Sequence, residues 1–446
     1  TLPPRLWVPA VIGPDSLFNF SNNNSCLVKI NIKSKKLMRF LTILFYFLLT
    51  VSCNSRGGGG GKVAGGGIGG SGVISSGRIT AFGSVEVNGT NFDTSNAEII
   101  INGVEIGVGD DFVPDNLELG MVVTVEGRIE DDGSFVADRV IYNANVIGPV
   151  EDISDIDATT KKIVVLGQTV IVNVVTLFEG TDFNAIAEDD VVAVSGYFDD
   201  TGIIRATFLE KTGDITSVLE FEVTGFVEDL DPDLETFMIN DLIIDYSLIS
   251  DELPDGIPAD DQFVEVQGEL VAGEIIAETI ELADELDGED GDEVEIMGFV
   301  TKVISENDII KFKIGNQEVH VDSDPETVIY VDGAPSDITP GQLLSAEGSL
   351  EDGILVAVEI EFWEPDQTEV EGIVDQVVFI DIDGELFPEF TLEGREDQVV
   401  QTDADTVFED IDKEEIEAGI NIEVKGVPQD IEQSVIKADK VSFEED

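Results

Sequence analysis

The chain has few of the residues that disulfides, metal centres and nucleic-acid sites require. Its 446 residues include two cysteines, one histidine, two tryptophans and 23 basic residues, against 94 acidic residues. Beyond residue 52 only one cysteine, Cys53, and one tryptophan, Trp363, remain. A body without a cysteine pair cannot form an internal disulfide, so burial must hold it together. His320 stands alone in an alternating strand pattern, and one histidine builds neither a metal site nor a Ser-His-Asp triad by itself.

Positive charge is scarce throughout the chain. The net charge is −71, and because residues 1–52 carry +5, the remainder carries −76. Repulsion of this size destabilises compact states and is relieved by salt, since the Debye length is ~8 Å at physiological ionic strength. We interpret the acidity as a solvated surface suited to saline surroundings. It argues against nucleic acid and anionic lipid as partners, because nucleic-acid sites need a basic groove with stacking aromatics.

Motifs of the common enzymes are also missing. There is no phosphate-cradling Gly-x-x-x-x-Gly-Lys, no Cys-x-x-Cys and no Gly-x-Ser-x-Gly elbow. Carboxylate pairs for glycoside chemistry could be drawn from the many acids in countless ways, so composition does not discriminate. We therefore predict a non-enzymatic protein without catalytic residues, and without a cofactor other than the calcium considered below.

The chain does contain five copies of one β-strand sequence unit. Residues 120–142 show it best: an apolar run ends at Gly127, a polar Asp-Gly turn follows, and a second Val- and Ile-rich run returns. We call the glycine that ends the first run the anchor glycine; the five are Gly127, Gly196, Gly268, Gly348 and Gly426. An earlier opening glycine begins each copy, 71 to 77 residues after the previous one: Gly77, Gly148, Gly225, Gly298 and Gly372. This period exceeds that of solenoid repeats, so each unit is large enough to be a small domain.

The order within a unit predicts the fold. In copy one, strands are expected from Gly77, over 98–101 and over 103–108, followed by one helical turn ending at Gly120. An apolar residue precedes the anchor glycine by ten positions in four copies: Leu117, Ile186, Ile338 and Ile416. The third copy has Pro258 there, beside Ile257. Five strands with a short helical plug before the fourth predict an all-β, tandem array of five small OB-like five-stranded β-barrels. A two-sheet sandwich is the alternative, and we expect each unit to fold separately, with its own sheet.

The expected organisation after a leader segment is a row of five repeats. Residues 1–37 are assigned to an upstream or mis-called start, 38–52 to a signal peptide and 53–76 to a Gly-rich linker. The repeats follow at 77–145, 146–214, 220–286, 293–364 and 368–446, and are named repeats 1 to 5 below.

The leader segment predicts a membrane anchor. Met38 and Arg39 precede twelve largely apolar residues, a length typical of a signal-peptide core and too short to span a bilayer. The following residues 48–53, Leu-Leu-Thr-Val-Ser-Cys, resemble the lipobox of bacterial lipoproteins, with Thr50 where leucine is usual. The resemblance implies lipidation at Cys53, and Asn54 rather than Asp implies an outer-membrane destination in a Gram-negative cell. The glycines of 57–72 then form a flexible tether on the order of 25 Å long.

Acidic residues gather in the loop expected between the first two strands of a copy. They are Asp152, Asp155 and Asp157 in repeat 2, Asp229, Asp231 and Asp233 in repeat 3, and Asp381 and Asp383 in repeat 5. In an OB barrel we expect this loop beside the one joining strands four and five, and oxygen ligands gathered there would suit Ca²⁺. The spacing does not match an EF-hand, and acidic turns are also the ordinary way to solvate a hairpin.

Three segments of copy one resemble a catalogued family. They are Gly-Arg-Ile-Thr-Ala-Phe-Gly-Ser-Val-Glu-Val-Asn-Gly from Gly77, Asn-Phe-Asp-Thr-Ser-Asn at 91–96 and Gly-Met-Val-Val-Thr-Val-Glu-Gly at 120–127. They resemble a bacterial cell-envelope family of unknown function, family 5666; the other copies keep the strand plan and the anchor glycine. The resemblance implies a small β-barrel and a lipoprotein context, but no activity.

Two functions follow as hypotheses. The first is a non-enzymatic, membrane-tethered cell-envelope array that displays a binding or spacing surface to an unknown protein or glycan partner. The second is a Ca²⁺-dependent or glycan-binding, adhesin-like module that uses the acidic loops. An enzyme ranks third.

Overall fold

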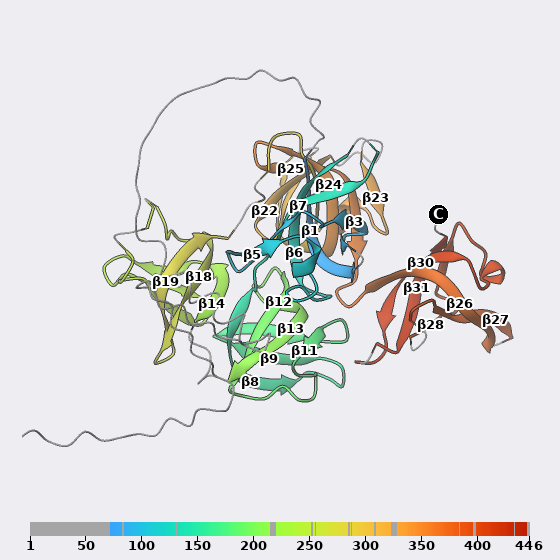
Figure 1. The fold of residues 1–446 in the computed structure, drawn as a ribbon, viewed down its shortest axis with the longest axis horizontal. Coiled ribbons are helices and arrows are strands. Elements are labelled where there is room, and N and C mark those ends of the chain that lie inside the picture. Colours follow the sequence, from blue (N-terminus) through green and yellow to red (C-terminus); the bar gives the residue numbers. More distant parts are fainter. Residues whose placement is uncertain are drawn as a thin grey trace, which may run out of the picture. The chain divides into compact units, whose positions relative to one another are not determined.

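The computed structural model describes residues 72–443, apart from gaps at 83, 131, 215–219, 251–252, 255, 284–285, 287, 307–308, 323–327, 383, 396–397 and 432. The described chain consists of β-strands with three short 3₁₀ helices, so the predicted all-β class is confirmed (Figure 1). No helix in these residues is long and apolar enough to cross a membrane.

Repeat 1 opens the series. Its elements are β1 (Gly72–Phe82), β2 (Val85–Val87), β3 (Thr90–Asp93), β4 (Glu98–Ile101), β5 (Val104–Val108), η1 (Asp110–Phe112), β6 (Val122–Ile129) and β7 (Phe135–Tyr142). β4 confirms the strand expected over 98–101, whereas β1 begins at Gly72, inside the segment expected as linker. β2 and β3 are strands of three and four residues that the sequence did not indicate, because such short segments show little periodicity.

Repeats 2 and 3 follow the same order. Repeat 2 contains β8 (Val146–Asp155), β9 (Lys161–Val165), β10 (Gln168–Val172), β11 (Leu177–Glu179), β12 (Asp190–Phe198) and β13 (Ile204–Asp214). Repeat 3 contains β14 (Phe221–Phe226), β15 (Glu228–Asp231), β16 (Thr236–Ile239), β17 (Leu242–Asp245), β18 (Phe263–Val271) and β19 (Glu274–Leu282).

Repeats 4 and 5 complete the chain. Repeat 4 contains β20 (Glu293–Glu306), β21 (Ile309–Ile314), β22 (Gln317–Asp322), β23 (Ile329–Val331), η2 (Pro335–Asp337), β24 (Leu343–Glu351) and β25 (Ile354–Trp363). Repeat 5 contains β26 (Thr368–Ile382), β27 (Glu385–Leu392), β28 (Val399–Gln401), β29 (Val407–Glu409), η3 (Lys413–Glu415), β30 (Asn421–Pro428) and β31 (Val435–Phe443), the orange-to-red strands of Figure 1.

Each repeat closes on itself as a barrel. We name its first strand the opening strand, the strand with the anchor glycine the anchor strand, and its last the closing strand. In repeat 4 the opening strand β20 pairs antiparallel with β21 and with the anchor strand β24, β21 pairs with β22, and β22 pairs parallel with the closing strand β25. β24 and β25 form the final hairpin. The same circuit, including the parallel pair with the closing strand, recurs in the other repeats. In repeat 3 the opening strand is interrupted after Phe226, and its continuation β15 makes the pair with the next strand, β16. This circuit selects the OB-like barrel over the sandwich.

The anchor glycines share one structural cause. In all five repeats the pairing of anchor and closing strands shifts register at this glycine, which marks a β-bulge. A Cβ added at any of the five would lie under 3.0 Å from a carbonyl oxygen of the closing strand, for example that of Val356 opposite Gly348. The bulge brings the two backbones so close that only glycine fits.

The opening glycines leave room for a side chain rather than for backbone. A Cβ at Gly148, Gly225 or Gly298 would overlap the side chain of Leu166, Ile239 or Ile314, respectively. Each of these residues ends a strand or lies in the turn that follows it, inside its own repeat. The glycine therefore lets the opening strand bend over the core.

The predicted plug is present, although it is shorter than one α-helical turn. Leu117, Ile186, Ile338 and Ile416 are all buried, and Ile257 packs against the core in repeat 3. Three-residue 3₁₀ helices precede this position in repeats 1, 4 and 5. Apolar burial at the mouth of the barrel is the feature that recurs, while the helical form varies.

The expectation of five separate sheets is wrong. The opening strands of two repeats pair with each other twice: β8 with β14 antiparallel, and β1 with β20 parallel. Repeats 2 and 3 thereby share one sheet, and repeats 1 and 4 share another. The residues just before each opening glycine cause this, because their second backbone edge is not used within the barrel and finds hydrogen-bond partners on another such strand.

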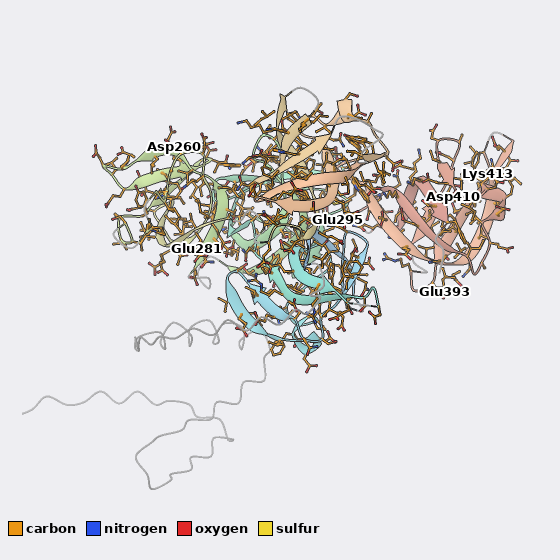
Figure 2. The ribbon with its side chains drawn as sticks, turned by 90° about the horizontal axis from the view of Figure 1, so that it is seen from above. Asp260, Glu281, Glu295, Glu393, Asp410 and Lys413 are labelled. Atoms are coloured by element: carbon orange, nitrogen blue, oxygen red, sulfur yellow. The ribbon has the colours of Figure 1, made fainter. Side chains whose placement is uncertain are left out.

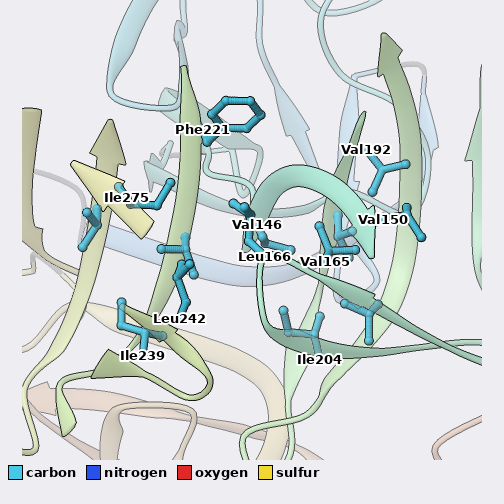
Figure 3. Packing of buried hydrophobic residues seen from close by; sticks show 14 of the residues in the cluster. Val146, Val150, Val165, Leu166, Val192, Ile204, Phe221, Ile239, Leu242 and Ile275 are labelled. Atoms are coloured by element: carbon cyan, nitrogen blue, oxygen red, sulfur yellow. The ribbon is translucent and has the colours of Figure 1, made fainter. Parts of the chain in front are cut away.

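The cores are joined in the same way for one of these pairs. Val146, Val150 and Leu166 of repeat 2 belong to the same buried cluster as Phe221 and Leu242 of repeat 3 (Figure 3). Repeat 5 keeps a cluster of its own, centred on Phe390, Ile422 and Val424. A pair of small barrels that share a core buries a larger fraction of its surface than two isolated ones would.

Replacing Gly348 by alanine should destabilise repeat 4 by about 2–4 kcal/mol, because the methyl group overlaps the Val356 carbonyl. Urea denaturation of the full chain, with Trp7 replaced by phenylalanine, checks this, since Trp363 at the end of β25 then reports on repeat 4. The matched control is Gly353→Ala in the turn of the same hairpin. No atom lies within 4 Å of that methyl group, so only a left-handed backbone cost of about 1 kcal/mol remains. Equal losses for both variants would contradict the overlap.

Candidate functional site

One group of polar positions recurs across the barrels. It contains a residue of the opening strand, the residue before the anchor glycine that pairs with it, and the partner of that residue on the closing strand. We call these three the cross-strand triad. The triads of repeats 1, 3, 4 and 5 are Ile74, Glu126 and Arg139; Glu222, Gln267 and Thr279; Glu295, Glu347 and Glu359; and Glu369, Lys425 and Lys440.

The triad of repeat 4 carries three acids directly opposite one another. Glu295 lies on β20, Glu347 on β24 and Glu359 on β25, and Figure 2 marks Glu295 on its barrel. Like charges in directly opposed strand positions destabilise a sheet. Burial, together with the neighbouring charges of Glu347 and Glu361, raises the pKa of Glu295 to about 8. Burial, with Glu359 and Glu293, also raises the pKa of Glu347.

The triad of repeat 5 is basic by comparison. Lys425 is 5% exposed; it pairs with Glu361 and lies 3.7 Å from Glu369, and its Nζ is 4.2 Å from the ring centre of Trp363. Lys440 pairs with Glu409 at 2.9 Å and with Asp332 at 3.4 Å. Both lysines thus contact acids of repeat 4, and the second and third positions carry two positive charges where repeat 4 carries two negative ones.

Glu222 is the most buried acid of these triads. Its side chain is 4% exposed, one oxygen accepts a long hydrogen bond of 3.5 Å from the Gln267 amide, and the other has no hydrogen-bond partner among the described residues. Burial, together with Glu265 and Glu220, raises its pKa well above the ordinary value. A carboxyl group in these surroundings holds its proton more readily than an exposed one.

Sequence reasoning did not find the triads, although a signal was present. Glu222, Glu295 and Glu369 each stand three residues before an opening glycine. This three-residue spacing puts a glutamate at the same position of three barrels, but the sequence does not indicate that another strand covers that position. Burial of the position therefore depends on how the strands pair.

The acids proposed for calcium do not form a group, and most of them lie on strands rather than in the expected loop: Asp152 and Asp155 on β8, Asp229 and Asp231 on β15, and Asp381 on β26. Asp155 pairs with Lys161 at 2.6 Å, and Asp157 accepts a hydrogen bond from the Thr159 amide at 2.8 Å. Asp152 is exposed on β8.

The corresponding acids of repeats 3 and 5 are arranged similarly. Asp231 accepts hydrogen bonds from the backbone of Asp233 and Leu234, Asp229 is exposed, and Asp381 accepts one from Gly384. Asp383 lies outside the described residues. Within the part of the chain that the structure describes, no three or more His, Cys, Asp or Glu side chains are placed to hold a metal ion. The calcium site stays a prediction.

The expectation that the two loops form one rim is wrong for repeat 2. Val146 and Val194 face each other, while the far end of β8 pairs with β9. The turn after β8 and the turn after β12 therefore lie at opposite ends of β8, because β8 and β12 are antiparallel. The acids of these two turns therefore cannot be counted as ligands of one calcium site on the ground that both turns are acidic.

His320 fits the interpretation of an ordinary strand residue. It lies on β22, and its Nε2 is 2.6 Å from a carboxylate oxygen of Glu318. Its side chain is 20% exposed. Cys53 and the signal segment lie outside the described residues.

Strand order, bulge and core together define the class of this protein: a tandem array of small OB-like β-barrels. The chain belongs to the family described as Domain of unknown function (DUF5666), whose model matches residues 71–141, 147–210, 297–361 and 371–442. This confirms the resemblance seen in copy one. Repeat 3 is not among the matched residues, yet it has the same barrel circuit and the bulge at Gly268. No curated protein matches the chain.

Replacing Glu295 by glutamine should remove part of the pH dependence of stability. A carboxyl group whose pKa rises from 4.5 to about 8 on folding stabilises the fold below pH 4.5, and this contribution is lost as the pH rises toward 8. The wild type should therefore lose stability on the order of a few kcal/mol over this interval relative to Glu295→Gln. Urea denaturation at several pH values, read through Trp363, measures the difference.

The matched control is Glu351→Gln, an exposed position at the end of β24 in the same repeat, which should keep the wild-type pH profile. If wild type and Glu295→Gln lose stability in parallel from pH 4.5 to 8, the Glu295 carboxyl group does not have the raised pKa that its burial indicates.

Proposed function

We propose that this chain is a non-enzymatic interaction array of the cell envelope, tethered to the outer membrane by a lipid on Cys53 and facing a protein or glycan partner. The proposal rests on what the five copies share. They share the glycine at the bulge and the barrel circuit, and both of these features build the scaffold.

The charged positions differ from copy to copy. The triad holds three acids in repeat 4, one acid and two lysines in repeat 5, and a Glu–Arg pair in repeat 1. A catalytic centre repeated along the chain would need the same chemical groups at the same positions. A variable surface on a constant scaffold supports display or spacing instead.

The tether follows from the leader sequence. The lipobox-like residues 48–53 and the glycines of 57–72 stand directly before β1. A lipid at Cys53 would hold the array at the membrane, and the glycine-rich stretch would space the acidic barrels from an anionic surface.

Cys53→Ser should release the chain from the membrane fraction, because the acyl chains have no other attachment point in the signal segment. Mass spectrometry of membrane-fraction peptides should find a diacylated Cys53 in the wild type. Cys26→Ser is the matched control and should leave the modification and the fractionation unchanged. An unmodified Cys53 peptide from the membrane fraction would end the lipoprotein proposal.

Calcium should not stabilise the array specifically. We expect Ca²⁺ to raise the melting temperature no more than NaCl of equal ionic strength, because it would then act only by screening acids. A larger rise that Asp229→Asn or Asp152→Asn reduces would favour the calcium-dependent module instead.

A further inference from the structure

The hairpin of β26 and β27 differs from its counterparts in other repeats. It exposes five large apolar side chains in an otherwise acidic protein: Val378 (55% exposed), Phe379 (40%), Ile380 (43%), Ile382 (38%) and Leu386 (55%). We call residues 377–386 the apolar ribbon. The corresponding hairpin of repeat 2 exposes Ile156 and is otherwise polar or charged around Asp152 and Asp155. The corresponding hairpin of repeat 4, β20 and β21, exposes two such side chains, Ile304 and Ile309. The barrel fold therefore does not require five.

The ribbon also has an open backbone edge. β26 pairs with β30 only over residues 368–373 and with β27 over 374–382. Its other side is without a strand partner from Asp375 to Ile382 among the described residues. Ile382 and Glu385 flank a two-residue turn, which directs the N–H and C=O of Ile382, Ile380 and Val378 toward β27. Those of Asp381, Phe379 and Val377 therefore point outward, where another strand could bind them.

The other four repeats show how opening strands associate in this protein, which is through the residues before the opening glycine. Their opening strands pair with one another, β1 with β20 and β8 with β14. β26 is the opening strand of repeat 5 and, in the described chain, has no opening strand of another repeat beside it. An opening strand of a second molecule could supply the partner that β26 lacks within the described chain.

We infer that two copies of this chain associate through β26, their apolar ribbons pairing edge to edge about a two-fold axis. Existing pairs use residues before the opening glycine, whereas in β26 that part carries Glu369, 3.7 Å from Lys425. The apolar run lies past Gly372 on the same strand. Antiparallel pairing of a strand with its own copy closes a dimer and leaves no further edge of β26 open.

The charges around the ribbon distinguish this partner from others. Asp375 and Glu389 flank it and Asp381 and Glu385 lie within it, so an anionic membrane would be repelled. Two copies would also repel each other through these acids, and salt would screen that repulsion. Association should therefore tighten as salt is added, whereas binding to a basic partner would weaken.

Sedimentation of the full chain carrying Cys53→Ser, at several salt and protein concentrations, tests the inference. We expect a monomer–dimer equilibrium that shifts toward dimer with salt. Val378→Thr with Ile380→Thr should weaken the dimer about tenfold or more, because four exposed apolar side chains become polar across the two copies. Phe379→Pro should do the same by removing an outward N–H.

The matched controls occupy the same hairpin positions in other repeats. Val378 and Ile304 each stand six residues after an opening glycine, and Ile380 and Ile156 each stand eight residues after one. Ile304→Thr and Ile156→Thr remove comparably exposed apolar groups and should leave the dimer intact.

A wild type that stays monomeric in every condition would overturn the inference, as would a dimer that the ribbon variants leave unchanged or that the controls weaken equally. Binding of the monomer to phosphatidylcholine vesicles, lost in the ribbon variants, would assign the ribbon to lipid and overturn it as well. Circular dichroism of each variant ensures that lost association is not lost folding. Because Cys53→Ser is present throughout, the result is independent of the proposed anchor.

Discussion

The close approach of two backbones at the anchor glycine is the constraint on which each barrel depends. At all five positions the anchor strand meets a carbonyl of the closing strand with no room for a methyl group. The bulge that results turns the last hairpin, so that the closing strand can pair parallel with a strand from the middle of the repeat. Without that turn the sheet would stay open and present its edges.

Closure leaves one edge unsatisfied, and this edge organises the chain. The residues before the opening glycine pair with the same stretch of another opening strand in four of the five repeats. Residues on the outer side of these strands then become covered. Glu222 pairs with Ile147 of β8 and Glu295 pairs with Ser75 of β1, so both acids lie where two repeats meet. Burial and neighbouring acids raise the pKa values of both. Assembly and proton affinity are thus linked in this protein.

The same constraint explains why the charge pattern varies while the scaffold does not. The five anchor glycines cannot change without a clash, but a triad position accepts glutamate, glutamine or lysine according to what covers it. Lys425, at 5% exposure, compensates acids of repeat 4. In a chain with a net charge of −71, such placed lysines allow acidic surfaces to lie close together.

The sequence by itself determined the number of copies, the β class, the glycine in each bulge and the buried plug residues, because each depends on contacts within one repeat. Leu117 and Gly127, for instance, are specified by periodicity and by a recurrent spacing. The tertiary structure alone decided which opening strands pair, which acids are buried and at which ends of a barrel the acidic turns lie. Those features arise between segments far apart in the chain, and a local pattern carries no information about what packs against its outer face.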